Sequence, residues 1–360
     1  MAMKSFGRSR FLRIYGVSLA ITAIIIAAVG FGMGPTALVT LIILSIIEIT
    51  FGLDCAVINA EVLRSMNAFW RRMFRTFGIF IAVFVMRLIL PLSIVAITAG
   101  LGFTEVVQLV MKHPDEYAAH IHEANPYIAM LGGTFLLMVF LDFLLGQARQ
   151  NPLSGIVRHL HVRGIRRYIQ LIIVLCLMAA AVFGAEPVRQ LPLFIAGMAG
   201  IIIYTIARGL AAFFAVRHTT HKPTADVVAR GGFVAFLYLE MLDASFSFDS
   251  VIGAFAVTTN VLLIAAGLGI GAIWLRSATI SMLQRGTLRH YPFLGLGANL
   301  AIGALGTLLL VEVNVPVPEL MTGVLGLAII IVAFLASVLH NQRAAKAGVS
   351  THIALRNHRQ

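Results

Sequence analysis

The stretch EITFGLD (residues 48–54) lies inside a long apolar run, and DASFSFD (residues 243–249) lies inside another. Each stretch carries two carboxylates six residues apart, with a phenylalanine midway between them. An acidic side chain at the centre of a membrane helix costs about 2.5 to 3.5 kcal/mol on insertion scales, so acids there generally serve a function. A chain that repeats this costly pattern is expected to use it on a polar substrate, and membrane transport is the leading hypothesis.

The composition is that of a membrane protein. Of the 360 residues, 59% are hydrophobic and 12% are charged, and the mean hydropathy is +0.94, whereas a soluble domain has about 25% charged residues. The net charge of +12 could indicate a nucleic-acid partner, but the basic residues cluster between the apolar runs. Membrane topology and anionic lipid account for them there. We therefore expect the lipid bilayer as a partner and no nucleic acid.

The sequence lacks the motifs of several common function classes. The two cysteines, Cys55 and Cys176, both fall in apolar runs, so no disulfide framework and no paired-cysteine metal site is available. Motifs of hydrolases, metalloproteases and ATP-driven pumps are also missing. We therefore expect a protein that is not an enzyme and has no cofactor, with an ion only as its substrate.

With about 20 apolar residues per membrane-spanning helix, the sequence predicts an all-α bundle of about ten such helices. Their expected ranges are 11–33, 36–62, 74–99, 127–146, 168–185, 190–208, 231–257, 260–283, 292–311 and 319–340. The long loop at 101–126 would lie outside, and the basic loops after every second helix would share the side of the N-terminus. Basic loops stay in the cytoplasm. We therefore expect an integral protein of a bacterial inner (plasma) membrane with both termini cytoplasmic.

The two acidic motifs fall in the second and seventh predicted helices, so they would run in opposite directions across the membrane. An arginine follows each motif in the next helix, as Arg87 and Arg276. We predict two inverted five-helix repeats, at 1–185 with the basic N-terminal tail and at 186–342, followed by a basic cytoplasmic tail at 343–360. In secondary transporters of this design, the substrate binds near the bilayer midplane at the repeat interface.

Charge counting indicates a cationic substrate, because five acids and only two arginines lie deep in the predicted helices, a formal charge of −3. A divalent cation reduces this charge to −1 and one retained proton brings it to zero, whereas an anion would add to the imbalance. Carboxylate and hydroxyl oxygens favour hard or borderline ions such as Mn²⁺, Mg²⁺ or Ca²⁺. The acids are Glu48, Asp54, Glu240, Asp243 and Asp249, and the arginines are Arg87 and Arg276.

Residues six apart on a regular helix lie about 120° apart around the axis and about 9 Å apart along it. Neither acidic pair could then converge on one ion unless its helix is interrupted. Gly52 in the first motif, and Ser245 and Ser247 in the second, are candidates for such an interruption. The alternative is that both helices are intact and that the acids form an ion-pair lattice with Arg87 and Arg276.

Three further features leave alternatives open. Cys55, directly after Asp54, is either a soft metal ligand or a small buried residue. Asp142 has either a role in transport or an arginine partner at the helix end. The outer stretch 101–126 either recruits metal or is a solvated amphipathic segment. Its candidate ligands are His113, Asp115, Glu116, His120, His122 and Glu123.

The acidic motifs and the arginines that follow them resemble the signatures of the TerC family of integral membrane proteins. The resemblance covers roughly residues 36–311, with Cys55 where that family usually has Asn. It rests on E-x-x-F-G-x-D-C at 48–55, D-x-x-F-x-x-D-S at 243–250, Arg87, Arg276 and RHYPFL at 289–294.

The TerC family is associated with tellurium resistance and manganese export, and it is grouped with LysE-like exporters. The resemblance implies that this chain exports a divalent metal cation, with Mn²⁺ as the expected ion. In this interpretation Glu240 exchanges protons, while Arg87 and Arg276 limit excess negative charge. The alternative is a membrane partner that supplies metal to exported proteins or supports a metal or tellurite stress-response assembly. The expected ion ligands are Glu48, Asp54, Asp243 and Asp249.

Overall fold

The computed structural model describes residues 2–146, 163–216, 225–285, 291 and 293–357. Within these ranges every regular element is a helix and there is no strand, so the predicted all-α class is confirmed. Eight helical segments in this part of the chain are long and apolar enough to cross a membrane. The chain is therefore an integral membrane protein built as a helical bundle.

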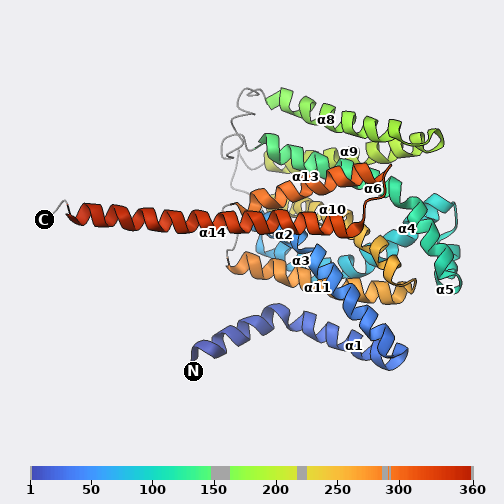
Figure 1. Cartoon of the computed structure of the whole chain (residues 1–360), viewed down its shortest axis with the longest axis horizontal. Helices are drawn as coiled ribbons and strands as arrows, with labels where there is room; N and C mark the ends of the chain where they lie inside the picture. The colour runs from blue at the N-terminus through green and yellow to red at the C-terminus, as the bar shows by residue number, and fades with distance from the viewer. Residues whose placement is uncertain (1, 147–162, 217–224, 286–290, 292, 358–360) are drawn as a thin grey trace.

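These eight segments differ from the ten predicted helices in two places. The first is α1 (Ala2–Phe51), which contains the first predicted helix and most of the second. Its two arms meet at a sharp corner (Figure 1), where Gly34 has a φ of 85° that only glycine adopts readily and Pro35 follows. The second is α10 (Ala225–Val257), which carries the second acidic motif and is not among the eight.

The third predicted helix is a continuous helical stretch of three segments, with a π-helix between two α-helices. It consists of α3 (Ala68–Phe80), the π-helix η1 (Ile81–Ile89) and α4 (Leu90–Ala99). Before it, α2 (Leu53–Ser65) continues from α1 after the single intervening residue Gly52.

The stretch 101–126 is mostly helical, so the prediction of a long outer loop is wrong. It contains α5 (Phe103–Lys112) and the first part of α6 (Pro114–Gly146). The Glu105 carboxylate accepts the Gly102 N–H at 2.9 Å and thereby caps the start of α5. Apolar side chains of both helices pack in one cluster with α4 and α10, which explains why a stretch rich in polar residues is ordered.

Five more helices complete the bundle. In Figure 1 the first residues of α1 and the last residues of α14 lie at the same end, in keeping with the prediction that both termini share one side of the membrane. The end of α14 extends well beyond the other helices (Figure 1). These helices are α8 (Arg163–Gly184), α9 (Pro187–Val216), α11 (Val261–Arg285), α13 (Leu294–Glu312) and α14 (Glu319–Asn357).

Small residues allow the central helices to approach closely. α6 packs against α13 and α9, and α1 packs along α11. A Cβ atom added to Gly133 on α6 would lie only 3.0 Å from the carbonyl oxygen of Gly306 on α13. Close backbone contact of this kind stabilises membrane helix pairs, where burial from water contributes little.

Candidate functional site

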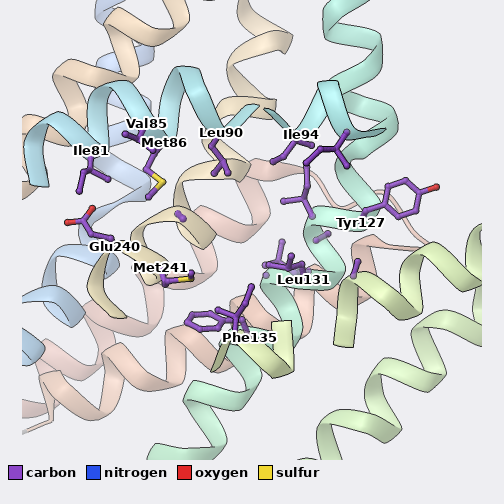
Figure 2. Close-up of a pocket in the computed structure, with 18 of the residues that line it drawn as sticks. Ile81, Val85, Met86, Leu90, Ile94, Tyr127, Leu131, Phe135, Glu240 and Met241 are labelled. Atoms are coloured by element: carbon purple, nitrogen blue, oxygen red, sulfur yellow. The ribbon is translucent and has the colours of Figure 1, made fainter. Parts of the chain in front are cut away.

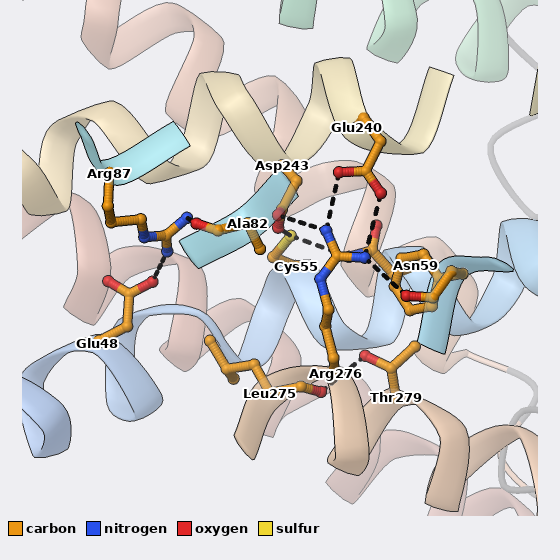
Figure 3. Close-up of polar contacts among 11 residues, drawn as sticks. Glu48, Cys55, Asn59, Ala82, Arg87, Glu240, Asp243, Leu275, Arg276 and Thr279 are labelled. Carbon is orange, nitrogen blue, oxygen red and sulfur yellow. Dashed lines mark hydrogen bonds and ion pairs between the residues drawn. The ribbon is translucent and has the colours of Figure 1, made fainter. Parts of the chain in front are cut away.

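Glu48 and Arg87 form a buried ion pair between α1 and η1. The Nη2 atom of Arg87 donates to Oε1 of Glu48 (Figure 3). Its Nη1 atom donates to the carbonyl oxygen of Ala82 at 3.2 Å. The exposed fractions of Glu48 and Arg87 are 5% and 3%. Because neither charge reaches water, each depends on the other to offset the loss of its hydration.

The π-helical winding of η1 has a cause in the sequence. Pro91, in the first turn of α4, has no N–H to donate to the carbonyl of Arg87 four residues earlier, and its ring crowds that carbonyl. The N–H of Leu90 instead bonds the carbonyl of Val85, five residues back. π-Helical segments are rare and are found frequently at functional sites, which marks the Arg87 segment as part of the candidate site.

Arg276 on α11 holds two acids of α10 at once. Its Nη1 and Nη2 atoms donate to the two carboxylate oxygens of Glu240 at 3.1 and 2.9 Å, and Nη2 also donates to Oδ2 of Asp243 at 3.0 Å (Figure 3). Nη1 donates further to the carbonyl of Phe74 at 3.2 Å, and the guanidinium carbon lies 4.3 Å from the centre of the Phe74 ring. The cation is therefore fixed by two carboxylates, a carbonyl and a cation–π contact.

Cys55 extends this cluster to α2. Its Sγ atom donates to Oδ1 of Asp243 at 3.5 Å and accepts from Nδ2 of Asn59 at 3.4 Å. Cys55 is 5% exposed and Asn59 is 3% exposed, and Oδ1 of Asn59 has no hydrogen-bond partner within the described part of the chain. In the view of Figure 3, Cys55 and Asp243 lie between the two guanidinium groups. The thiol is thus buried within the polar cluster, and a role as a metal ligand stays a prediction.

The predicted helix interruption occurs only in the first motif, and there it is small. Gly52 separates α1 from α2 with φ and ψ of −89° and 7°. Its N–H still bonds the carbonyl of Glu48 at 2.9 Å, and its carbonyl still accepts from the N–H of Ala56 at 3.1 Å. The backbone of α10 is helical from end to end. The expectation that the helix unwinds at Ser245 and Ser247 is therefore wrong.

The side chains of Asp54 and Asp249, the second acids of the two motifs, lie outside the described residues. The predicted site of four carboxylates is therefore untested as a whole. Among the side chains that the structure does describe, no group of three or more His, Cys, Asp or Glu could hold a metal ion. The described acids of the motifs contact Arg87 and Arg276 instead, as the ion-pair alternative requires.

The other candidates from the sequence lie apart from these pairs. Asp142 on α6 pairs with Arg208 on α9, so it has the arginine partner of one alternative, and a role in transport stays a prediction. His120 lies 3.8 Å from Glu123, one turn away on α6. In the part of the chain covered by the structure, the acidic and histidine residues between positions 113 and 123 form no metal-binding group.

The sequence analysis missed two glycines that make room for the pairs. A Cβ atom added to Gly78 on α3 would lie 3.0 Å from Oε1 of Glu240 and would overlap the guanidinium of Arg276. One added to Gly271 on α11 would overlap the side chain of Glu48. The stretch that carries Arg87 thus supplies a glycine beside the pair of Glu240 and Arg276. The helix that carries Arg276 supplies one beside the pair of Glu48 and Arg87. Single glycines among large apolar residues, as in FRTFGIF and GLGIGAIW, are the signal that could have revealed them.

Comparison with curated proteins found no match to this chain. Comparison with solved structures found none either. A family model described as "Protein of unknown function (DUF475)" matches residues 53–344, which include α10, both arginines and Cys55. Because this match covers most of the sequence, the chain belongs to the DUF475 family.

Proposed function

We propose that this chain is a secondary transporter that moves a divalent metal cation across the membrane, with export of Mn²⁺ as the expected activity. The observation that carries the proposal is the pair of buried arginine–carboxylate contacts, Glu48 with Arg87 and Asp243 with Arg276. Ionisable groups deep in a membrane bundle are costly and mark ion pathways.

In this proposal the arginines act as counter-charges of the empty site. A guanidinium keeps a carboxylate ionised and in place without blocking all of its oxygen lone pairs. An arriving cation would bind the carboxylates from the other side, and the guanidinium would move aside as charge builds up. Carboxylate oxygens with the carbonyl oxygen of Asn59 would suit a hard or borderline ion such as Mn²⁺. Asp54 and Asp249 are the proposed additional ligands.

Glu240 is the proposed proton-exchanging group. It shares Arg276 with Asp243, so a cation that captures Asp243 leaves Arg276 to Glu240 alone. When the cation leaves, Asp243 would bind Arg276 again and Glu240 would lose part of its contact with it. Glu240 could then take up a proton, which avoids an unpaired buried charge. Coupling of ion and proton movement would follow from this competition for one guanidinium.

The proposed architecture consists of two inverted five-helix repeats, with alternating access between them. Three observations support it: each first acid pairs with the arginine of the following helix, the corresponding helices α6 and α13 pack together, and the two chain ends lie at the same end of the bundle. In this proposal that end lies in the cytoplasm of a bacterial cell, because basic loops generally stay there. A site at the repeat interface matches the general design of such transporters.

Flux into proteoliposomes tests the proposal. Purified protein reconstituted alone should carry Mn²⁺ down a gradient, and Glu48→Gln and Asp243→Asn should abolish this flux. Asp142→Asn is the matched control, because Asp142 also pairs with an arginine but lies away from the two pairs, and it should retain flux. Equal flux from all three variants would remove Glu48 and Asp243 from the ion pathway, and no flux of any divalent metal by the wild type would exclude the transporter.

The second candidate is a membrane partner for metal-dependent or stress-response proteins. It is favoured by the fact that each described acid of the two motifs already has an arginine or thiol neighbour, as a purely structural lattice would have. A partner protein should show no flux alone and should retain a second subunit through purification in mild detergent. A transporter should need no such subunit.

A further inference from the structure

A large apolar cavity lies beside the second ion pair. It has a volume of about 710 Å³ and lies between the η1–α4 stretch and helices α6, α9 and α10. Its walls are almost entirely aliphatic and aromatic; among the described residues that line it, Glu240 carries the one carboxylate, and Thr98 and Tyr127 carry hydroxyls. Apart from Glu240, the residues that line the cavity take no part in the cation site described above, so its occupant requires a separate explanation.

The cavity is elongated along the η1–α4 stretch. Glu240 and Ile81 lie at one end and Tyr127 at the other, with Leu90 between them (Figure 2). The helical wall from Ile81 to Ile94 is at most about 20 Å long, the length at the α-helical rise of about 1.5 Å per residue, because the π-helix η1 rises less per residue. This length is comparable with half of the hydrocarbon thickness of a bilayer, which is about 30 Å in total. The shape therefore fits a single extended chain.

The chemistry of the walls excludes a polar or charged occupant. Both oxygens of the Glu240 carboxylate already accept hydrogen bonds from Arg276, so while this contact holds the carboxylate is not free to pair with a ligand. A polar solute would lose its hydration without gaining hydrogen bonds from the aliphatic walls. Apolar cavities also remain dry or take up apolar molecules. An uncharged hydrocarbon is the chemical class that these walls accept.

The cavity opens toward the lipid. Ile97, Leu237 and Met241 line it and are 79%, 41% and 41% exposed. Ile97 belongs to the membrane-spanning stretch Ala68–Ala99, and the other two lie one helical turn apart on α10. Exposed apolar side chains within a membrane bundle face acyl chains rather than water. The entrance is therefore lateral, from within the bilayer.

We propose that this cavity binds one acyl chain of a membrane phospholipid, which enters laterally past Ile97, Leu237 and Met241 and extends to Glu240. A hydrocarbon chain at that end excludes water from one side of the contact between Glu240 and Arg276. The occupied cavity thereby maintains the low-dielectric surroundings that strengthen this contact. This proposal concerns lipid binding and does not depend on the ion that the protein carries.

Fluorescence quenching by phospholipids with brominated acyl chains tests the site. In a background with Trp70 and Trp274 changed to Phe, Phe135→Trp places a probe on the cavity wall, at a residue only 2% exposed. Phe334→Trp is the lipid-facing reference, since Phe334 is 39% exposed, and Phe255→Trp is the buried reference outside the cavity. We expect brominated vesicles to quench the probe at 135 as strongly as the one at 334, and the probe at 255 far less.

The cavity-filling substitution Ala196→Phe supplies the matched control. It should reduce quenching of the probe at 135 and leave the probe at 334 unchanged. The same quenching at 135 and 255, or none at 135, would overturn the proposal. If the tryptophan variants do not fold, mass spectrometry of lipid retained by the detergent-purified protein decides. Wild type should retain more phospholipid than Ala196→Phe, and equal retention would count against the site.

Discussion

Asp243 contacts Arg276 just as Glu48 contacts Arg87: in both motifs the first acid pairs with the arginine of the next membrane helix along the chain. The two sites are not equal, however, because Arg276 also binds Glu240. The position three residues before Glu48 is Ser45, whose hydroxyl donates to the carbonyls of Leu41 and Gly267. Among the side chains that the structure describes, one guanidinium therefore serves one acid in the first site and two acids in the second.

This difference predicts unequal costs of removing the arginines. Arg276→Ala should lower the free energy of unfolding by about 3–5 kcal/mol, the range for a broken buried ion pair, and Arg87→Ala should lower it less, because only one acid loses its partner. Thermal unfolding of the purified protein in detergent measures the order. Arg208→Ala is the control, since its pair with Asp142 is partly exposed and should contribute about 0–1 kcal/mol. A larger loss from Arg87→Ala than from Arg276→Ala would contradict the assignment.

The two glycines predict a loss of function without any change of charge. Gly78→Ala would press a methyl group against Glu240 and Arg276, and Gly271→Ala would press one against Glu48. Both variants should reduce cation flux in proteoliposomes. Gly209→Ala is the matched control, because a Cβ at Gly209 meets nothing within 4 Å. Unchanged flux in Gly78→Ala and Gly271→Ala, with both proteins folded, would show that the pairs tolerate displacement and are not the ion pathway.

The second acids of the motifs carry a prediction from the sequence alone. Asp54→Asn and Asp249→Asn keep side-chain volume and remove one anionic ligand each, so both should abolish metal flux, and the inverted repeat requires effects of similar size. Flux assays across several divalent metals measure this, with Asp142→Asn as the reference for an acid outside the motifs. Wild-type rates from either variant would remove that acid from the proposed site.

The topology can be tested by labelling single cysteines from outside the cell. Cysteine at Glu123 or Val188, both strongly exposed at 72% of the side chain and 88% of the residue, should react with an impermeant thiol reagent. Cysteine at position 160 or 220, in the basic loops, should not react, because those loops are expected in the cytoplasm. Reaction at 160 and 220 alone would reverse the orientation, whereas reaction at 160 together with 123 or 188 would overturn the topology and remove the argument for opposed repeats.

Much of the fold follows from the sequence, because runs of apolar residues and the loops between them are local signals. The site follows only in part. Glu48, Asp243 and Glu240 stand out as acids in apolar runs, but their distribution between Arg87 and Arg276 depends on how α1, α10 and α11 pack. That packing depends on side-chain volumes such as those at Gly78 and Gly271, whose contacts are far away in the sequence.

Two errors have local physical causes. The polar stretch 101–126 is predicted as a loop because its charges mask an apolar face that packs on α4 and α10. The π-helix is missed because IAVFVMRLI has no internal Gly or Pro, and the residue responsible, Pro91, lies beyond its end. Pro91 lies four residues after Arg87, and it affects the winding of the turn before it because it cannot donate to the Arg87 carbonyl.

The π-helical winding of η1 offers the pair of Glu48 and Arg87 a conformational change that is not offered to the contacts of Arg276. A change from five-residue to four-residue hydrogen bonding within Ile81–Ile89, before the turn that Pro91 constrains, would alter the direction of Arg87 relative to Glu48 without any residue leaving the helix. Around Arg276, α11 is an ordinary α-helix, so it has no π-helical segment that could rewind. Amide hydrogen exchange should therefore be faster at 83–89 than at 272–278, and equal protection would argue against it. We therefore expect Arg87 to change its position relative to Glu48 through the winding of its own helix, while Arg276 keeps its position relative to its two acids.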